Sequence, residues 1–123
     1  MKKILGIGTD IIEISRFSSL NLENLAKRIL TEAEYFDYTN AKNKKNFIAK
    51  KFSIKESIAK AFGFGIGALL SFKDIEISKD NKGKPICKMK KIPKNFQNLE
   101  IIVHISISDS KNLIQTYCII EIL

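Results

Sequence analysis

The sequence of 123 residues has no tryptophan, one histidine and two cysteines, and these scarcities exclude several kinds of site. A single histidine excludes a metal site built from several imidazoles, and Cys87 and Cys118 do not have the CxxC spacing of zinc ligands. Free thiols in a reducing compartment are their expected state. No apolar run is long enough to span a membrane, and Asp10 interrupts the apolar N-terminal stretch without a small-residue cleavage site after it. We therefore expect a cytoplasmic protein with no membrane partner.

The charge is strongly basic, with 21 Lys and Arg against 13 Asp and Glu and a formal net charge of +8. Such a balance favours an acidic or phosphorylated partner, which leaves nucleic acid, a nucleotide cofactor and an acidic protein open. The length fits a single domain over residues 1–123 but is short for a large enclosed site. A site for a big substrate is therefore expected to be shared between subunits.

The order of apolar patterns predicts an α+β fold, with helices grouped on a mainly antiparallel sheet. A capping box from Thr31 to Glu34 marks the start of one helix, and Gly63 is a typical stop for the next. Helical spacing predicts helices at 21–30, 31–40 and 44–62. Strands are predicted at 3–14, 71–78, 86–89, 100–108 and 113–122.

Charges interrupt the apolar face of the helix predicted at 44–62. At about 100° per residue its Phe, Ile and Ala side chains form one broad arc, yet Lys51 and Lys55 fall inside that arc. A lysine on an apolar arc must extend to water or meet an anion, so we expect a phosphate near both. Glu56 and Lys60 lie side by side at the edge of the arc, where a surface ion pair is the ordinary alternative.

Asp10 and Glu56 are the best carboxylate pair because each belongs to a strongly apolar element. Two hard oxygen ligands, together with water and phosphate oxygens, make a usual Mg²⁺ site. A strand end with a solvated Asp10 is the alternative from spacing alone. Gly6 and Gly8 indicate a close backbone approach or a bulge, and they do not complete a dinucleotide-binding fingerprint.

The histidine, His104, shares a strand face with Ser106 and Ser108, which raises the possibility of a His–Ser hydrolase. That site is disfavoured because same-face neighbours on a strand are about 7 Å apart. The chain also has no Gly-x-Ser-x-Gly nucleophile elbow. A hydrogen-bonded structural histidine, or a donor to a phosphate, is the better interpretation.

The lysine clusters within 42–51 and 88–94 raise a second hypothesis, a small basic nucleic-acid-binding module. A single-strand binder interleaves aromatic residues with its lysines, and a duplex binder presents a groove-reading helix. Neither pattern is present, since the aromatic residues mostly occupy apolar arcs. The cluster at 88–94 is typical of a solvated sheet edge that resists pairing with other chains.

Several short motifs together resemble the holo-acyl-carrier-protein synthases, the short-chain 4′-phosphopantetheinyl transferases. They are Gly6-Ile7-Gly8-Thr9-Asp10-Ile11, Lys51-Phe52-Ser53-Ile54-Lys55-Glu56-Ser57, Lys60-Ala61-Phe62-Gly63 and His104-Ile105-Ser106-Ile107-Ser108-Asp109. Arg28-Ile29-Leu30-Thr31 with Glu34, Ser71-Phe72-Lys73-Asp74-Ile75 and Gly83-Lys84-Pro85 match as well. The resemblance covers nearly the whole chain in order, and it implies a 4′-phosphopantetheinyl transferase-like fold.

The resemblance implies Mg²⁺-dependent transfer of 4′-phosphopantetheine from coenzyme A to a serine of apo acyl carrier protein, for fatty acid biosynthesis. Adenosine 3′,5′-bisphosphate would be released. It further implies that Asp10 and Glu56 ligate the metal and that Lys60 contacts the pyrophosphate, which makes these three the catalytic residues. Glu56 would also help to remove the serine proton, directly or through water.

The same resemblance implies the binding residues. For coenzyme A they are Lys42, Lys51, Lys55, Lys60, Gly63 and His104, with Lys42, Lys51 and His104 near the 3′-phosphate. For the acidic carrier protein they are Arg16, Lys27 and Arg28. Family members of this length are homotrimers with coenzyme A held between neighbouring subunits, and no nucleic acid partner is implied. Lys51 stands where many relatives have Arg, which removes a bidentate phosphate contact.

Overall fold

The computed structural model describes residues 3–123; Met1 and Lys2, the start of the basic N-terminal stretch, lie outside the described part. The three helices are α1 (Leu22–Ile29), α2 (Glu32–Thr39) and α3 (Lys44–Ala61). The five strands are β1 (Lys3–Glu13), β2 (Ile75–Lys79), β3 (Pro85–Met89), β4 (Ile101–Asp109) and β5 (Leu113–Ile122). The predicted α+β class is confirmed, although β2 begins later than predicted because Phe72–Asp74 forms a 3₁₀ turn.

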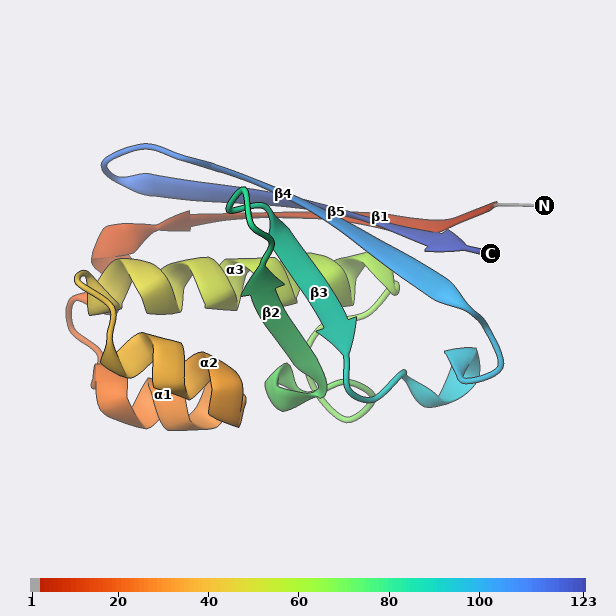
Figure 1. The fold of residues 1–123 in the computed structure, drawn as a ribbon, viewed down its shortest axis with the longest axis horizontal. Coiled ribbons are helices and arrows are strands. Elements are labelled where there is room, and N and C mark those ends of the chain that lie inside the picture. The colour runs from red at the N-terminus through yellow and green to blue at the C-terminus, as the bar shows by residue number, and fades with distance from the viewer. Residues whose placement is uncertain (1–2) are drawn as a thin grey trace.

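The strands form two separate antiparallel sheets. One has the order β1-β5-β4, and the other is the hairpin β2-β3. In the larger sheet Asp10 pairs with Thr116, and His104 pairs with Ile119. Figure 1 shows α3 running along one face of this sheet, with α1 and α2 on the side of α3 away from the sheet. The hairpin lies next to α3 and β4.

Local signals in the sequence determine where α3 begins and ends. The Asn43 side chain accepts a hydrogen bond from the Asn46 N–H at 3.0 Å and caps the first turn. At the other end Gly63 has a φ of 96°, and its N–H bonds to the Lys60 carbonyl at 2.9 Å. A left-handed residue at this place ends a helix and favours glycine, so the predicted stop at Gly63 is confirmed.

The strand β1 packs backbone to backbone on α3. A Cβ built on Gly6 would overlap the carbonyl oxygen of Ala61, and one on Gly8 would overlap that of Ser57. The predicted close backbone approach of this strand is therefore confirmed. Because no side chains separate the two elements, the residues that follow Gly8 on β1 are held at a set distance from the last turns of α3.

Buried apolar side chains pack along the length of α3. Ile48, Ile54 and Ile58 are at most 1% exposed, which agrees with the apolar arc predicted for this helix. A polar link also reaches the sheet, because the Ser53 and Thr116 hydroxyls lie 2.9 Å apart in the buried interface. Among residues 3–123, no helix has the length and apolar character needed to cross a membrane.

Candidate functional site

Two charged side chains meet where β1 passes the C-terminal half of α3. Lys60 Nζ lies 3.2 Å from Asp10 Oδ1 and donates to the Thr9 carbonyl oxygen at 3.0 Å. The other carboxylate oxygen, Asp10 Oδ2, is buried and has no hydrogen-bond partner within the described residues. A buried carboxylate oxygen without a donor is unfavourable, so this atom suits a cation or donor from outside the chain.

Glu56 is half-buried one helical turn before Lys60. Burial raises the pKa of Glu56, and the neighbouring Asp10 carboxylate raises it further against the opposing effects of Lys60 and Arg16. Like charges that share a site disfavour each other's ionisation, and a cation between them removes this penalty. The structure therefore brings Asp10, Glu56 and Lys60 together, as the sequence predicted.

These two carboxylates fit a Mg²⁺ ion whose remaining ligands come from outside the chain. In the part of the chain that the structure describes, no group of three or more His, Cys, Asp or Glu side chains could hold a metal ion alone. Mg²⁺ usually keeps several waters and binds through one or two carboxylates together with substrate phosphates. The unpartnered Asp10 Oδ2 and the raised pKa of Glu56 are consistent with that arrangement.

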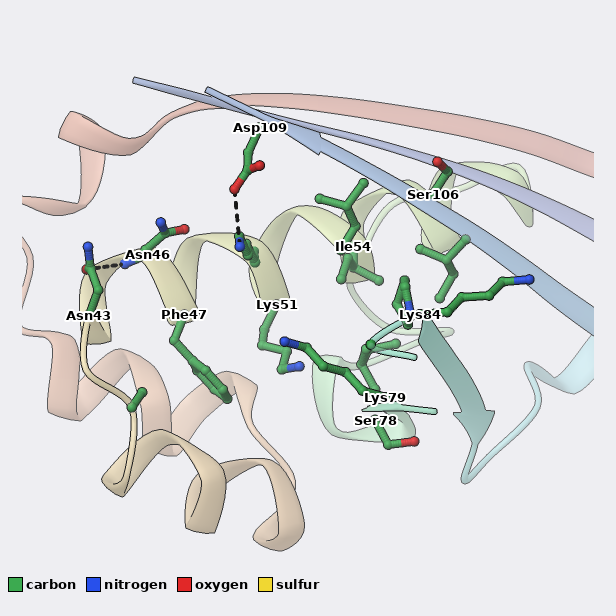
Figure 2. A pocket seen from close by; sticks show the side chains of 17 residues that line it. Asn43, Asn46, Phe47, Lys51, Ile54, Ser78, Lys79, Lys84, Ser106 and Asp109 are labelled. Carbon is green, nitrogen blue, oxygen red and sulfur yellow. Dashed lines mark hydrogen bonds and ion pairs between the residues drawn. The ribbon is translucent and has the colours of Figure 1, made fainter. Parts of the chain in front are cut away.

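A cavity of about 560 Å³ lies against the N-terminal half of α3 (Figure 2). Its other walls come from the β2-β3 hairpin and from β4. The charged residues that line it are Lys50, Lys51, Lys79, Lys84 and Asp109. Lys50 Nζ pairs with Asp109 Oδ2 at 3.2 Å, which leaves an excess of positive charge on the walls. Such a cavity suits an anionic ligand.

Lys51 is the most buried of the cavity lysines, with 8% of its surface exposed. Its Nζ lies 4.9 Å from the centre of the Phe47 ring, and no carboxylate of residues 3–123 forms an ion pair with it. Burial lowers the pKa of Lys51, and the nearby Lys79 ammonium also lowers it, against the attraction of Glu34. Figure 2 shows the ends of Lys51 and Lys79 approaching each other. A bound phosphate would offset both the cost of burying the Lys51 charge and its repulsion by Lys79.

The carboxylates and the cavity lie on opposite flanks of α3. At about 100° per residue, Glu56 and the cavity residue Ile54 point about 160° apart around the helix. The sheet order agrees, because β1 carries Asp10 at one edge and β4 lines the cavity at the other. One chain therefore does not direct Asp10 and Glu56 into its own cavity.

The structure corrects the prediction for Lys55. Its Nζ is fully buried and donates to Glu34 Oε1 at 2.6 Å, to the Ile29 carbonyl at 2.8 Å and to the Phe72 carbonyl at 3.0 Å. All three ammonium protons therefore have acceptors inside the chain. The prediction of a phosphate near Lys55 is wrong, because a carboxylate of α2 is the anion that this lysine meets.

The remaining predicted coenzyme A residues lie around the cavity rim or farther away. Lys42 is exposed between Ala41 and Asn43, which both line the cavity. His104 lies on the outer face of the sheet, where its Nε2 is 3.2 Å from Glu121 Oε1, so it does not face the cavity of its own chain. Gly63 is exposed at the end of α3, and nothing lies within 4 Å of a Cβ built on it.

The predicted carrier-protein residues are exposed on two elements. Arg16 lies in the 3₁₀ turn after β1, with its guanidinium 5.6 Å from the centre of the Phe52 ring. It is close enough to Glu56 to lower that residue's pKa. Lys27 and Arg28 occupy the last turn of α1, as predicted from the helix pattern.

Three of the cavity lysines and the buried role of Glu34 were not predicted from the sequence. Lys50, Lys79 and Lys84 come from α3, β2 and the turn before β3. Lys50 belongs to the lysine cluster within 42–51 and Lys84 to the Gly83-Lys84-Pro85 motif, whereas no sequence signal marked Lys79. Glu34 was identified as a helix cap, which the structure confirms, but its contact with Lys55 joins residues far apart in sequence.

Comparisons with known proteins point to one enzyme family. The family model of the 4′-phosphopantetheinyl transferase superfamily matches residues 6–118. The holo-[acyl-carrier-protein] synthases of Bacillus cytotoxicus and Bacillus subtilis are 43% and 41% identical to this chain, and each match covers 96% of both chains.

Solved structures show the same similarity. A crystal structure of a holo-(acyl-carrier-protein) synthase from Bacillus anthracis in complex with CoA (3′,5′-ADP) has a TM-score of 0.84 at 40% identity and covers 96% of each chain. A Helicobacter pylori holo-[acyl-carrier-protein] synthase in complex with coenzyme A has a TM-score of 0.76 at 31% identity, covering 93% of this chain and 98% of that one. The chain therefore belongs to the 4′-phosphopantetheinyl transferase superfamily, among the holo-acyl-carrier-protein synthases.

Proposed function

We propose that this protein transfers 4′-phosphopantetheine from coenzyme A to a serine hydroxyl of apo acyl carrier protein. The products are holo acyl carrier protein and adenosine 3′,5′-bisphosphate, and the reaction serves fatty acid biosynthesis. The observation that carries the proposal is the group of Asp10, Glu56 and Lys60, with one carboxylate oxygen buried and unpartnered. The similar proteins are holo-acyl-carrier-protein synthases, which supports the substrate and the acceptor.

The chemistry requires that the serine oxygen attack the β-phosphorus of coenzyme A. The pyrophosphate P–O bond to adenosine 3′,5′-bisphosphate breaks, and the serine hydroxyl loses its proton. Mg²⁺ held by Asp10 and Glu56 would supply positive charge at the pyrophosphate. Lys60 would bind a pyrophosphate oxygen, since its side chain is about half exposed beside Asp10. Glu56 would accept the serine proton, directly or through water.

The basic cavity is our proposed site for the nucleotide end of coenzyme A. Lys51 and Lys79 bring two ammonium groups near each other, and only an anion offsets their repulsion. Lys42 stands at the rim and would add a third positive charge near the 3′-phosphate. His104 and Gly63 complete the proposed coenzyme A contacts, His104 from the outer face of a neighbouring subunit's sheet.

A shared site requires assembly, and we propose a homotrimer with each coenzyme A between two subunits. In one chain the carboxylates and the cavity face away from each other, so a second copy must place its cavity beside them. The outer face of the larger sheet is suited to contact between copies because it exposes large side chains. They include Ile4, Ile7, Ile11, Ile102 and Tyr117. An exposed apolar surface of this kind marks a protein–protein contact.

The carrier-protein surface is proposed at Arg16, Lys27 and Arg28. Lys27 and Arg28 are exposed on α1, and Arg16 is exposed on the 3₁₀ turn near Glu56. Complementary charge mainly raises the encounter rate with an acidic partner. Replacing the three cations should therefore lower kcat/KM for the carrier, with a smaller effect on the KM of coenzyme A.

The test is a mass measurement. Purified protein, apo acyl carrier protein and coenzyme A are incubated with Mg²⁺ or with a chelator, and we expect the carrier to gain one phosphopantetheine only when Mg²⁺ is present. No gain with several carriers would contradict the proposal. The nucleic-acid hypothesis would return only if the protein bound oligonucleotides with steep salt dependence and no competition by coenzyme A.

A further inference from the structure

A buried ion pair between Glu34 on α2 and Lys55 on α3 joins segments that are distant in the chain. Besides its bonds to Ile29 and Phe72, Lys55 donates to Glu34 Oε1 at 2.6 Å. Glu34 Oε1 also accepts the Thr31 N–H at 2.9 Å, and Glu34 Oε2 accepts the Ile77 N–H at 2.7 Å. Both side chains are at most 1% exposed. Every ammonium proton and both carboxylate oxygens therefore have partners.

This pair supplies the hydrogen bonds that attach the hairpin to the helices. The hairpin forms its own two-stranded sheet, so no strand ladder fixes its position relative to α3. Within residues 3–123, the hydrogen bonds that join segment 71–89 to a helix are Lys55 Nζ to the Phe72 carbonyl and the Ile77 N–H to Glu34. The apolar contacts of Ile75 and Ile77 are not directional, so they fix the position of the hairpin less sharply than these hydrogen bonds do.

The attached segments are the walls of the basic cavity. Ile77, Ser78 and Lys79 line it from β2, and Lys51 and Ile54 line it from α3. Ile77 is the residue whose N–H is held by Glu34, and Lys55 directly follows Ile54. The ion pair lies behind the cavity and joins its two walls.

We propose that Glu34 and Lys55 are positioning residues that set the spacing of the cavity walls, and thereby the affinity for the nucleotide end of coenzyme A. The inference rests on the proposed function for the identity of the ligand. Lys79 must stay opposite Lys51 for both ammonium groups to reach one phosphate, and this geometry changes if β2 moves. Neither Glu34 nor Lys55 touches the ligand, because both are enclosed by protein.

Two double variants separate positioning from simple packing. Glu34→Leu/Lys55→Met replaces the pair by apolar side chains, which buried ion pairs often tolerate, but it removes the acceptor for the Ile77 N–H. Glu34→Gln/Lys55→Met is also neutral, and its single amide oxygen keeps an acceptor for the Ile77 N–H, while the Thr31 N–H of the helix cap loses its carboxylate acceptor. Lys90→Met removes one partner of an exposed pair with Glu76 and is the control.

The measurements are the Kd of adenosine 3′,5′-bisphosphate by calorimetry, the KM of coenzyme A, and Tm. We expect the Leu/Met variant to bind the bisphosphate at least about tenfold more weakly, with KM raised in parallel and kcat less affected. The Kd of the Gln/Met variant for the bisphosphate should stay within about threefold of the wild-type value, like that of the Lys90→Met control. Wild-type affinity in a folded Leu/Met variant, or equal losses in both double variants, would overturn the proposal.

Amide exchange on the unmodified protein keeps the test decisive if the double variants do not fold. The Ile77 amide should exchange as slowly as the amides of α3, whereas that of Lys82, in the turn before β3, should exchange fast. Fast exchange at Ile77 would show that the attachment does not hold and would overturn the inference. A wild-type protein that binds the bisphosphate without transferring phosphopantetheine would contradict the proposed function alone, and the affinities would still decide this inference.

Discussion

The α-carbon of Gly8 lies so close to the carbonyl oxygen of Ser57 that no side chain fits between β1 and α3. A Cβ on Gly8 would also stand 2.7 Å from the Ala61 backbone nitrogen. Both obstacles are backbone atoms, which do not rotate away as a flexible side chain does. Asp10 follows two residues later on the same strand, so its distance from Glu56 depends on this contact.

Gly8→Ala should therefore damage both stability and transfer. Overpacking of a tight contact costs about 1–3 kcal/mol, and displacement of β1 moves Asp10 away from Glu56 and Lys60. We expect a lowered Tm and a transfer rate reduced by about 100-fold, measured by thermal unfolding and the carrier mass assay. Gly65→Ala is the matched control, because nothing lies within 4 Å of a Cβ at that position. Equal behaviour of the two variants would contradict a positioning role for Gly8.

Glu56→Gln should abolish transfer without lowering stability. Burial and the Asp10 carboxylate both disfavour the charged form of Glu56, so a neutral amide of the same shape removes an unfavourable charge. We expect Tm in the absence of metal to be unchanged or raised, and kcat to fall by about 100-fold or more. The increase in Tm caused by Mg²⁺ together with coenzyme A should also disappear.

The control for Glu56 is Glu100→Gln, an exposed carboxylate just before β4. It should change neither transfer nor the response to Mg²⁺. Near-normal turnover by the Glu56→Gln protein would refute its assignment as a metal ligand and proton acceptor.

Lys51→Met should weaken coenzyme A binding and stabilise the free protein. A phosphate contact from a charged donor contributes about 1.5–3 kcal/mol, so Kd should rise by about tenfold or more. Without ligand, Lys51 is a buried ammonium with no carboxylate partner among residues 3–123, and methionine removes that penalty. Lys88→Met, on an exposed position of β3, is the control and should change neither quantity.

The stabilisation by Lys51→Met should depend on pH. Burial holds the folded-state pKa of Lys51 below its ordinary value of 10.5. Below the lowered pKa the lysine is charged in both states and carries the full burial penalty, whereas above 10.5 it is neutral in both and the penalty is gone. The Tm difference between variant and wild type should shrink as pH rises through this window. A difference that grows with pH would contradict the burial of an unpaired charge.

Ile7→Asp should disrupt the proposed trimer. Ile7 is 58% exposed on the outer face of β1, in register with Ile119 and, across β5, with His104. A carboxylate buried between copies would be strongly unfavourable, so we expect a smaller particle by light scattering and little transfer activity. Phe36→Asp on α2 is the control, because Phe36 is 69% exposed away from the sheet and should leave the mass unchanged. An unchanged mass for Ile7→Asp would contradict assembly through this sheet face.

Structural features that depend on neighbouring residues in the sequence could be predicted. The helix α3 begins at an asparagine cap and ends at a left-handed glycine, and the four residues from Thr31 to Glu34 contain a complete capping box. The apolar alternation of β4 likewise agrees with its burial pattern. Each of these features depends on residues a few positions apart, so the sequence contains the whole interaction.

The surroundings of Lys55 could not be predicted from local sequence patterns. Its place on an apolar arc was predictable from helical periodicity, but periodicity does not say what lies opposite that arc. The structure places Glu34 there, with its carboxylate 2.6 Å from the ammonium. Lys51, by contrast, lines a cavity and lacks a carboxylate partner within the described residues, and a phosphate beside it stays a prediction. Two lysines four positions apart thus have different surroundings, one internal and one open to a ligand.

By itself, the sequence determined the fold class, the ends of the helices and the motifs that resemble one enzyme family, because these depend on short-range spacing and on residue types. Only the tertiary structure decided that Asp10 reaches Lys60, that Lys55 is occupied by Glu34, and that the basic cavity lies on the flank of α3 away from the carboxylates. These are contacts between elements distant along the chain. Their distances follow from packing, above all from the direct backbone contact of β1 with α3, which no local pattern specifies.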